Sequence, residues 1–177
     1  ERAQRRVAEG YRAVKFGWGP MGPDLATDVA LVHAARAAIG DTATLLVDAG
    51  APWTAQEAIR RVEAFREFNP FWLEEALASD DLAGWARLTA AAEGMRIATG
   101  EQETLAGAFR DLLEIGHVDV IQPDLARAGG FTQGRRIADH AVKIAQDTIL
   151  LDTKIEEPVF KKIAELSSFA QSVFDDS

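Results

Sequence analysis

Residues 71–76 read FWLEEA, an apolar run that ends on two adjacent glutamates and follows Asn69-Pro70, where a helical pattern stops. The same succession of apolar run, loop and amphipathic helix repeats along residues 1–140. Further apolar runs lie at 13–16, 44–48, 95–99 and 118–122, and helical patterns such as 25–39 and 55–68 lie between runs. Strands that alternate with helices of this length predict right-handed βαβ units and a parallel sheet.

Two α/β architectures share this pattern, a doubly wound open sheet and a (β/α)8 barrel. No Gly-x-Gly-x-x-Gly sequence follows any of the predicted strands, so a dinucleotide-binding fold has no support. The glycine-rich segment 16–22 (FGWGPMG) leads into a loop instead of opening a helix directly. We therefore interpret it as a loop on the active face and not as a phosphate-binding loop.

The composition is that of a globular protein and excludes some partners. The chain has 177 residues, of which 47% are hydrophobic and 27% charged, and its formal net charge is -9. Such an acidic chain is not expected to bind nucleic acid, which requires clustered lysine and arginine. Cysteine is absent, so a metal would be held by oxygen or imidazole ligands. The sequence contains no apolar run of about 18 residues, so it predicts no membrane span. We expect a cytoplasmic protein.

Residue usage changes near residue 140. The chain has fourteen arginines and one lysine before this point, and four lysines and no arginine after it, while all fourteen glycines precede residue 141. We therefore divide the chain into a barrel part, 1–140, and a tail of different origin, 141–177. A plain polar helical tail is the alternative. Within the tail we expect a strand at 148–151 and a helix at about 158–174.

Three acidic residues stand at the ends of consecutive predicted strands. Asp48, Glu74 and Glu101 are separated by 26 and 27 residues, about one strand-helix unit each. In a parallel barrel the carboxyl ends of the strands open on one face, so the three carboxylates should converge. Mutual repulsion is relieved by a hard divalent cation, and oxygen ligation is what Mg²⁺ prefers. The alternative is that each acid caps the helix that follows it.

An ordered set of motifs resembles the barrel domain of the enolase superfamily, in the mandelate racemase-like branch that includes acid-sugar dehydratases. The motifs are VKFGWGP (14–20), LLVDAG (45–50), FWLEEA (71–76), ATGEQE (98–103) and VIQPDLARAGGFTQ (120–133). The resemblance covers about residues 1–140 and implies a partial (β/α)8 barrel. It also implies that Asp48, Glu74 and Glu101 are the Mg²⁺ ligands. Glu75 matches the second acid of its motif, with Ala76 where the family has proline.

The resemblance further implies the chemistry and two catalytic candidates. The family uses Mg²⁺ to bind a substrate carboxylate while a base removes the adjacent proton, here from a sugar acid that then loses water. Lys15 matches the first lysine of the Lys-x-Lys motif, and Gly17 replaces the second. Asp124 matches the aspartate that orients a catalytic histidine, whose expected place is taken by Asp152. His33, His117 and His140 offer no clear substitute.

The resemblance also predicts what the chain lacks relative to the family, namely the first and last barrel strands and the N-terminal capping domain. Exposed strand edges favour association, so we expect a homo-oligomer or completion by other chains. The main hypothesis is a Mg²⁺-dependent acid-sugar dehydratase. The alternative is a catalytically incompetent fragment or chimera that keeps the metal-binding carboxylates without the base. A Schiff base at Lys154 is a third, weaker hypothesis.

Overall fold

The fold is known from a computed structural model that describes residues 1–22 and 24–151. Its five strands are β1 (Ala13–Gly17), β2 (Thr44–Asp48), β3 (Trp72–Glu74), β4 (Arg96–Thr99) and β5 (Val120–Ile121). Between and around them lie α1 (Arg2–Ala8), α2 (Leu25–Ile39), α3 (Ala55–Phe65), the 3-10 turn η1 (Arg66–Phe68), α4 (Leu82–Ala91), α5 (Ala106–Glu114) and α6 (Phe131–Leu151). The prediction of alternating strands and helices is confirmed.

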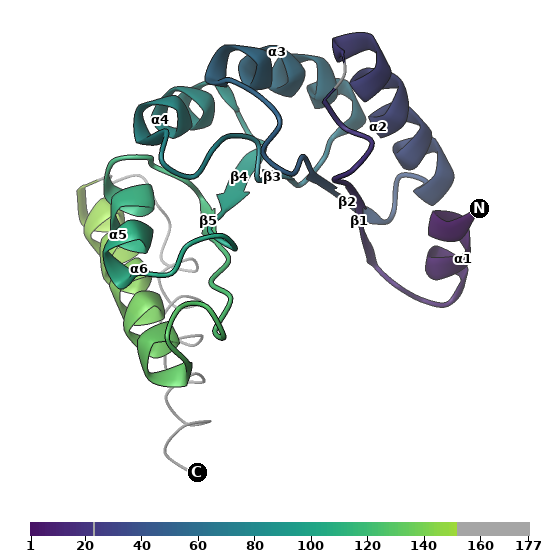
Figure 1. Ribbon diagram of the computed structural model, residues 1–177. Coiled ribbons are helices and arrows are strands. Elements are labelled where there is room, and N and C mark those ends of the chain that lie inside the picture. The colour runs from purple at the N-terminus through teal and green to yellow at the C-terminus, as the bar shows by residue number, and fades with distance from the viewer. Residues whose placement is uncertain (23, 152–177) are drawn as a thin grey trace.

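The topology decides between the two architectures. All four strand pairs are parallel, and the spatial order β1-β2-β3-β4-β5 is the order in the sequence. Figure 1 shows the strands on the inner side of an arc and helices α2 to α6 along its outer side. A strand order without reversal, with the connecting helices on one face, is the winding of a (β/α)8 barrel and not of a doubly wound sheet.

The core lies between the strands and the outer helices. Apolar side chains on the outer faces of β2, β3 and β4 are fully buried against helices α2, α3 and α4. The strand side chains include Leu45, Val47, Leu73 and Ile97. The helix side chains buried in the same core include Val32, Val62, Trp85 and Leu88. Strand side chains alternate between faces, so the other half of each strand points to the inner side of the arc. The candidate site is built there.

One predicted element is wrong. Residues 148–151, expected as a strand, form the last turn of α6, which runs without interruption from Phe131 to Leu151. The short apolar run Ile149-Leu150-Leu151 favours a strand only when read alone. After Gly134, however, α6 contains neither glycine nor proline, so nothing ends the helix before this run. The predicted helix at 158–174, Asp152 and Lys154 lie outside the described residues.

Helix α6 also crosses residue 140, so the change from arginine to lysine usage falls within a helix. The division of the chain at this residue and the separate origin of residues 141–177 stay predictions. In residues 1–22 and 24–151, none of the helices has the length and apolar character needed to cross a membrane.

Candidate metal centre

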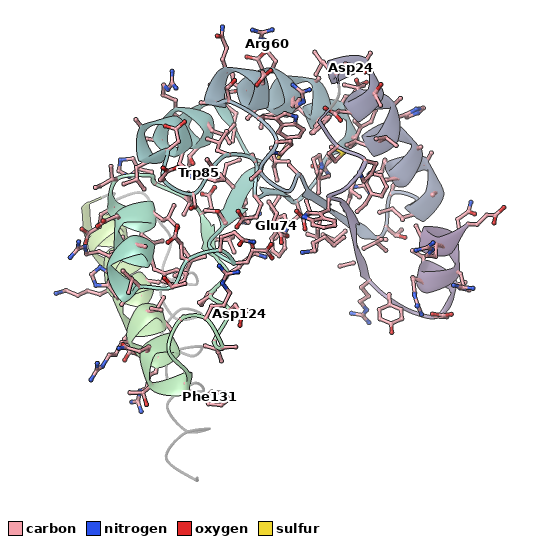
Figure 2. All side chains as sticks on the ribbon, in the orientation of Figure 1. Asp24, Arg60, Glu74, Trp85, Asp124 and Phe131 are labelled. Atoms are coloured by element: carbon pink, nitrogen blue, oxygen red, sulfur yellow. The ribbon has the colours of Figure 1, made fainter. Side chains whose placement is uncertain are left out.

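Strand register brings two of the predicted metal ligands together. Asp48 is the last residue of β2, and it pairs in register with Glu74, the last residue of β3. Figure 2 labels Glu74 on the inner side of the arc, and Asp48, at the same level of the neighbouring strand, faces the same side. Glu74 is fully buried and Asp48 is only 8% exposed. Two carboxylates on adjacent strands at the same level must repel each other unless a cation lies between them.

Lys15 supplies a positive charge at this point. It lies on β1, and its Nζ donates a hydrogen bond of 2.6 Å to Glu74 Oε1 and lies 3.2 Å from Asp48 Oδ2. Burial alone would lower the pKa of Lys15, but the hydrogen bonds and charges of Glu74 and Asp48 raise it above its ordinary value. The lysine is therefore an ammonium at neutral pH. Trp72 Nε1 donates to the other oxygen, Glu74 Oε2, at 3.1 Å.

The Asp48 carboxylate is only partly compensated. Burial raises its pKa, the charge of Glu74 raises it further, Lys15 opposes these effects, and Glu101 adds to the increase. Asp48 Oδ1 is buried and accepts no hydrogen bond from any described residue. A buried carboxylate oxygen without a partner is costly and calls for a cation or water. The two carboxylates offer only oxygen ligands and carry more negative charge than Lys15 neutralises, which fits a hard cation such as Mg²⁺.

Glu101, the third predicted ligand, lies in the turn after β4. Its backbone N–H is 3.3 Å from Glu75 Oε1, and its side-chain Oε1 accepts a hydrogen bond from Gln102. Across residues 1–22 and 24–151, no three acidic or histidine side chains are arranged to hold a metal ion. Lys15 instead lies between Asp48 and Glu74. The assignment of Asp48, Glu74 and Glu101 as ligands stays a prediction.

Glu75 holds the backbone that carries Glu101. It is buried, with a left-handed backbone φ of 47°. Its Oε1 accepts hydrogen bonds from Thr99 Oγ1 at 2.9 Å and Gly100 N at 2.8 Å, besides the contact with the Glu101 N–H. Burial raises the pKa of Glu75, and these donors oppose the increase. Glu75 follows the last residue of β3, and its left-handed backbone, which the sequence does not indicate, turns its side chain toward the turn after β4.

Close backbone packing at Gly17 leaves no space for the second lysine of the Lys-x-Lys motif. Gly17 has φ +128°, and a Cβ atom built there would lie 2.1 Å from the carbonyl oxygen of Asp48. The next residue, Trp18, donates its N–H to the same oxygen. Any side chain at position 17 would push β1 away from β2. A base at this position is therefore incompatible with the observed strand pairing.

Asp124, the second predicted catalytic residue, is exposed in the loop between β5 and α6, apart from Glu74 in Figure 2. Its Oδ1 accepts a hydrogen bond of 2.8 Å from the N–H of Ala126, so the carboxylate stabilises its own turn. The nearby Arg127 donates to the side chain and backbone of Gln102, linking the loops that follow β4 and β5. The role of Asp124 in orienting a base stays a prediction.

The three histidines, all within the described residues, serve other parts of the structure. The His33 ring lies 5.5 Å from that of Phe68, and His140 Nε2 lies 3.2 Å from Glu114 Oε1. His117 precedes β5 and has a left-handed φ of 53°. Among the described residues, none of the three hydrogen-bonds to Asp124.

Comparison with known proteins places this geometry in a family. Residues 1–147 match the family model described as enolase C-terminal domain-like. The chain therefore belongs to the enolase C-terminal domain-like family, and the resemblance to the mandelate racemase-like branch of the enolase superfamily is confirmed. The five parallel strands are part of the barrel of that domain.

Two curated relatives illustrate the range of activities in the family. The chain is 38% identical over 136 residues to 3,6-anhydro-alpha-L-galactonate cycloisomerase of Streptomyces coelicolor, covering 77% of this chain and 37% of the relative. It is 38% identical over 121 residues to L-talarate/galactarate dehydratase of Salmonella typhimurium, covering 68% and 30%. The chain thus spans about a third of the length of these relatives.

Solved structures agree with the fold and include bound metal. A racemase from Streptomyces coelicolor with bound magnesium superposes with a TM-score of 0.75 at 37% identity, covering 81% of this chain and 42% of that one. L-Talarate dehydratase from Polaromonas, complexed with Mg and L-glucarate, gives 0.74 at 35% identity, covering 80% and 38%. Structures of relatives of this chain therefore contain magnesium, and one of them also contains L-glucarate.

Proposed function

We propose that this chain carries the metal-binding side of a Mg²⁺-dependent enzyme that removes the α-proton of a sugar acid and eliminates water from the neighbouring carbon. The observation that carries the proposal is the in-register pair Asp48 and Glu74, which faces the inner side of the barrel. Among the described residues, Lys15 is the one cation that pairs with both carboxylates. The magnesium-bound relatives and the dehydratases among them support it.

The residues of this chain would bind the metal, bind the substrate carboxylate and orient the base. Asp48, Glu74 and Glu101 would hold Mg²⁺, with Glu75 fixing the turn of Glu101 through its hydrogen bonds. The bound metal would stabilise the negative charge that develops on the substrate carboxylate when the α-proton leaves. Lys15 would add a second cation to that carboxylate. Asp124 would orient an imidazole supplied from outside the described residues.

A second candidate function is metal binding without turnover, in a fragment or chimera that lacks the base. Two observations favour it. The backbone contact between Gly17 and Asp48 excludes a lysine base at position 17, and among the described residues none of the three histidines hydrogen-bonds to Asp124. The two candidates share the metal centre and differ only in proton abstraction.

Two measurements on the same preparation separate these candidates. Calorimetric titration with MgCl₂ reports metal binding, and NMR in D₂O reports loss of the α-proton from a panel of sugar acids such as galactarate and D-gluconate. Exchange together with a new keto product supports the dehydratase. Magnesium binding without exchange on any acid supports the incompetent fragment. Absence of magnesium binding overturns both. Asp139→Asn, at an exposed acid of α6, is the matched control for Asp48→Asn.

A further inference from the structure

We propose that Lys15 is the internal counter-cation of this site. Its ammonium neutralises Asp48 and Glu74 when no metal is bound, Mg²⁺ must displace it to reach both carboxylates, and the released ammonium is then free to bind the substrate carboxylate. The last step rests on the proposed function. The displacement itself concerns only the metal and residues of this chain.

The geometry places one cation where two anions meet. Lys15 Nζ is within 2.6 Å of Glu74 Oε1 and 3.2 Å of Asp48 Oδ2, so the ammonium bridges the two strands β2 and β3. A metal ion that bound both carboxylates would have to use the same oxygens. Ammonium and metal therefore compete for one position, because two cations in contact with the same oxygens would repel each other.

Exposure indicates which partner can move. The Lys15 side chain is 44% exposed, whereas those of Asp48 and Glu74 are 12% and 1% exposed. Glu74 is also held through its second oxygen by Trp72. The carboxylates are thus fixed by the strands, and the lysine reaches them from solvent with a flexible stem. Lys15 can leave without any rearrangement of the strands.

The charge balance of the site predicts how the loss of the Lys15 ammonium changes magnesium affinity. One ammonium compensates two carboxylates incompletely, as the raised pKa of Asp48 and its unpaired Oδ1 indicate. Removal of the ammonium would leave the carboxylates with no counter-charge and abolish the competition, so both effects strengthen metal binding. A lysine that merely supported the structure of the site would act in the opposite direction. Its removal would loosen the carboxylates and weaken metal binding.

The test is calorimetric titration of MgCl₂ into wild type, Lys15→Met and Lys143→Met. Methionine keeps the apolar stem of Lys15 and removes the charge, and Lys143 is an exposed lysine on α6 that serves as the control. We expect Lys15→Met to bind Mg²⁺ roughly tenfold more tightly than wild type, the size of one charge-assisted contact. Lys143→Met should match wild type. Unchanged or weaker binding by Lys15→Met overturns the inference.

A second measurement needs neither metal nor substrate. In chelator, the melting temperatures of Lys15→Met, Glu74→Gln and the double variant form a double-mutant cycle. If the ammonium neutralises Glu74, Lys15→Met lowers the melting temperature in the wild-type background and has less effect when Glu74→Gln is present. Additive effects overturn the counter-cation role. Lys15→Gln replaces Lys15→Met in both experiments if the latter does not fold.

The outcomes also separate this inference from the proposed function. Magnesium binding of equal strength in wild type and Lys15→Met overturns the displacement and leaves the proposed function standing. Binding by Lys15→Met but not by wild type supports the competition between lysine and metal and overturns the proposed function of the wild-type chain. If neither protein binds magnesium, the proposed function and the displacement both fail.

Discussion

The molecule buries carboxylates in two places that differ in how their charge is compensated. On the outer helices, Asp28 accepts a hydrogen bond of 2.8 Å from the Gly22 N–H on one oxygen and of 2.7 Å from Arg61 Nε on the other. The Arg61 guanidinium also lies 4.5 Å from the centre of the Trp53 ring. On the inner side, Asp48 shares the ammonium of Lys15 with Glu74 and leaves one oxygen without a partner.

The difference separates a carboxylate whose charge and hydrogen bonds are balanced from one whose charge and hydrogen bonds are not. Asp28 and Arg61 balance each other in charge and in hydrogen bonds, so the pair joins helix α2 to helix α3, holds the loop before α2 at Gly22, and has nothing left to bind a ligand. The inner site has more negative than positive charge, which destabilises the metal-free protein and favours a cation. Replacing the carboxylate by a neutral amide should therefore lower stability at Asp28 and not at Asp48.

The largest effect is expected at the balanced pair. Arg61→Met leaves the buried Asp28 without its cation, which typically costs about 3–5 kcal/mol in the free energy of unfolding. Urea unfolding followed by circular dichroism measures this loss, and magnesium should not restore it. Arg60→Met, at an exposed position of the same helix near the top of Figure 2, is the matched control. Equal unfolding curves for the two variants would show that the Asp28–Arg61 pair does not stabilise the fold.

A smaller effect is expected at Glu75, which connects the inner site to the turn after β4. Glu75→Ala leaves three donors of that turn without their acceptor, at a cost of about 1–3 kcal/mol for a buried group. It should also weaken magnesium binding, because Glu101 is carried by the same turn. Glu75→Gln keeps an acceptor oxygen and should restore much of both properties. Calorimetry and urea unfolding that ranked glutamine with alanine would contradict this role.

The smallest effect on stability is expected at Glu57, a surface acid whose pKa is lowered by its surroundings, whereas that of Asp48 is raised. Glu57 and Thr54 form a capping box at the start of α3, with Thr54 N donating to Glu57 Oε2 at 2.9 Å. Hydrogen bonds from the Thr54 backbone and then from its side chain lower the pKa of Glu57. The lowered pKa means that its stabilising contribution is present above the unfolded-state pKa and is lost as pH falls through the folded-state value.

Glu57→Gln should accordingly lower the melting temperature slightly at pH 7, and the difference from wild type should disappear in acid. Melting curves between pH 7 and pH 3 measure both properties. A difference that stayed constant over this range would mean that the ionised form of Glu57 does not contribute to the cap.

Much of the fold follows from local patterns in the sequence. The apolar runs and helix boundaries predict the alternating strands and helices and the parallel sheet, and the spacing of Asp48 and Glu74 by one strand-helix unit places both at strand ends. The strand order, which separates a barrel from a doubly wound sheet, does not follow from these patterns. The residues that lie next to these two carboxylates depend on the register between neighbouring strands, which the sequence pattern does not specify. The strand expected at 148–151 shows the same limit, because a short apolar run fits a strand or a buried helix end equally well.

The candidate site could be predicted in its residue types but not in its contacts. The contact between Gly17 and the carbonyl of Asp48 depends on how closely β1 approaches β2. The hydrogen bonds of Glu75 depend on a left-handed backbone at its own position and on the course of the turn after β4. The bridging position of Lys15 depends on three strands at once. Such interactions between distant segments leave no local signal in one sequence.

The central claim is that the unbalanced carboxylates at the ends of β2 and β3 form a magnesium site. The most direct measurement is calorimetric titration of MgCl₂ into wild type and Asp48→Asn, with Asp139→Asn as the control. We expect wild type and the control to bind magnesium and Asp48→Asn to show no binding, while the metal-free Asp48→Asn protein is no less stable than wild type. Magnesium binding by Asp48→Asn with wild-type affinity would contradict the account.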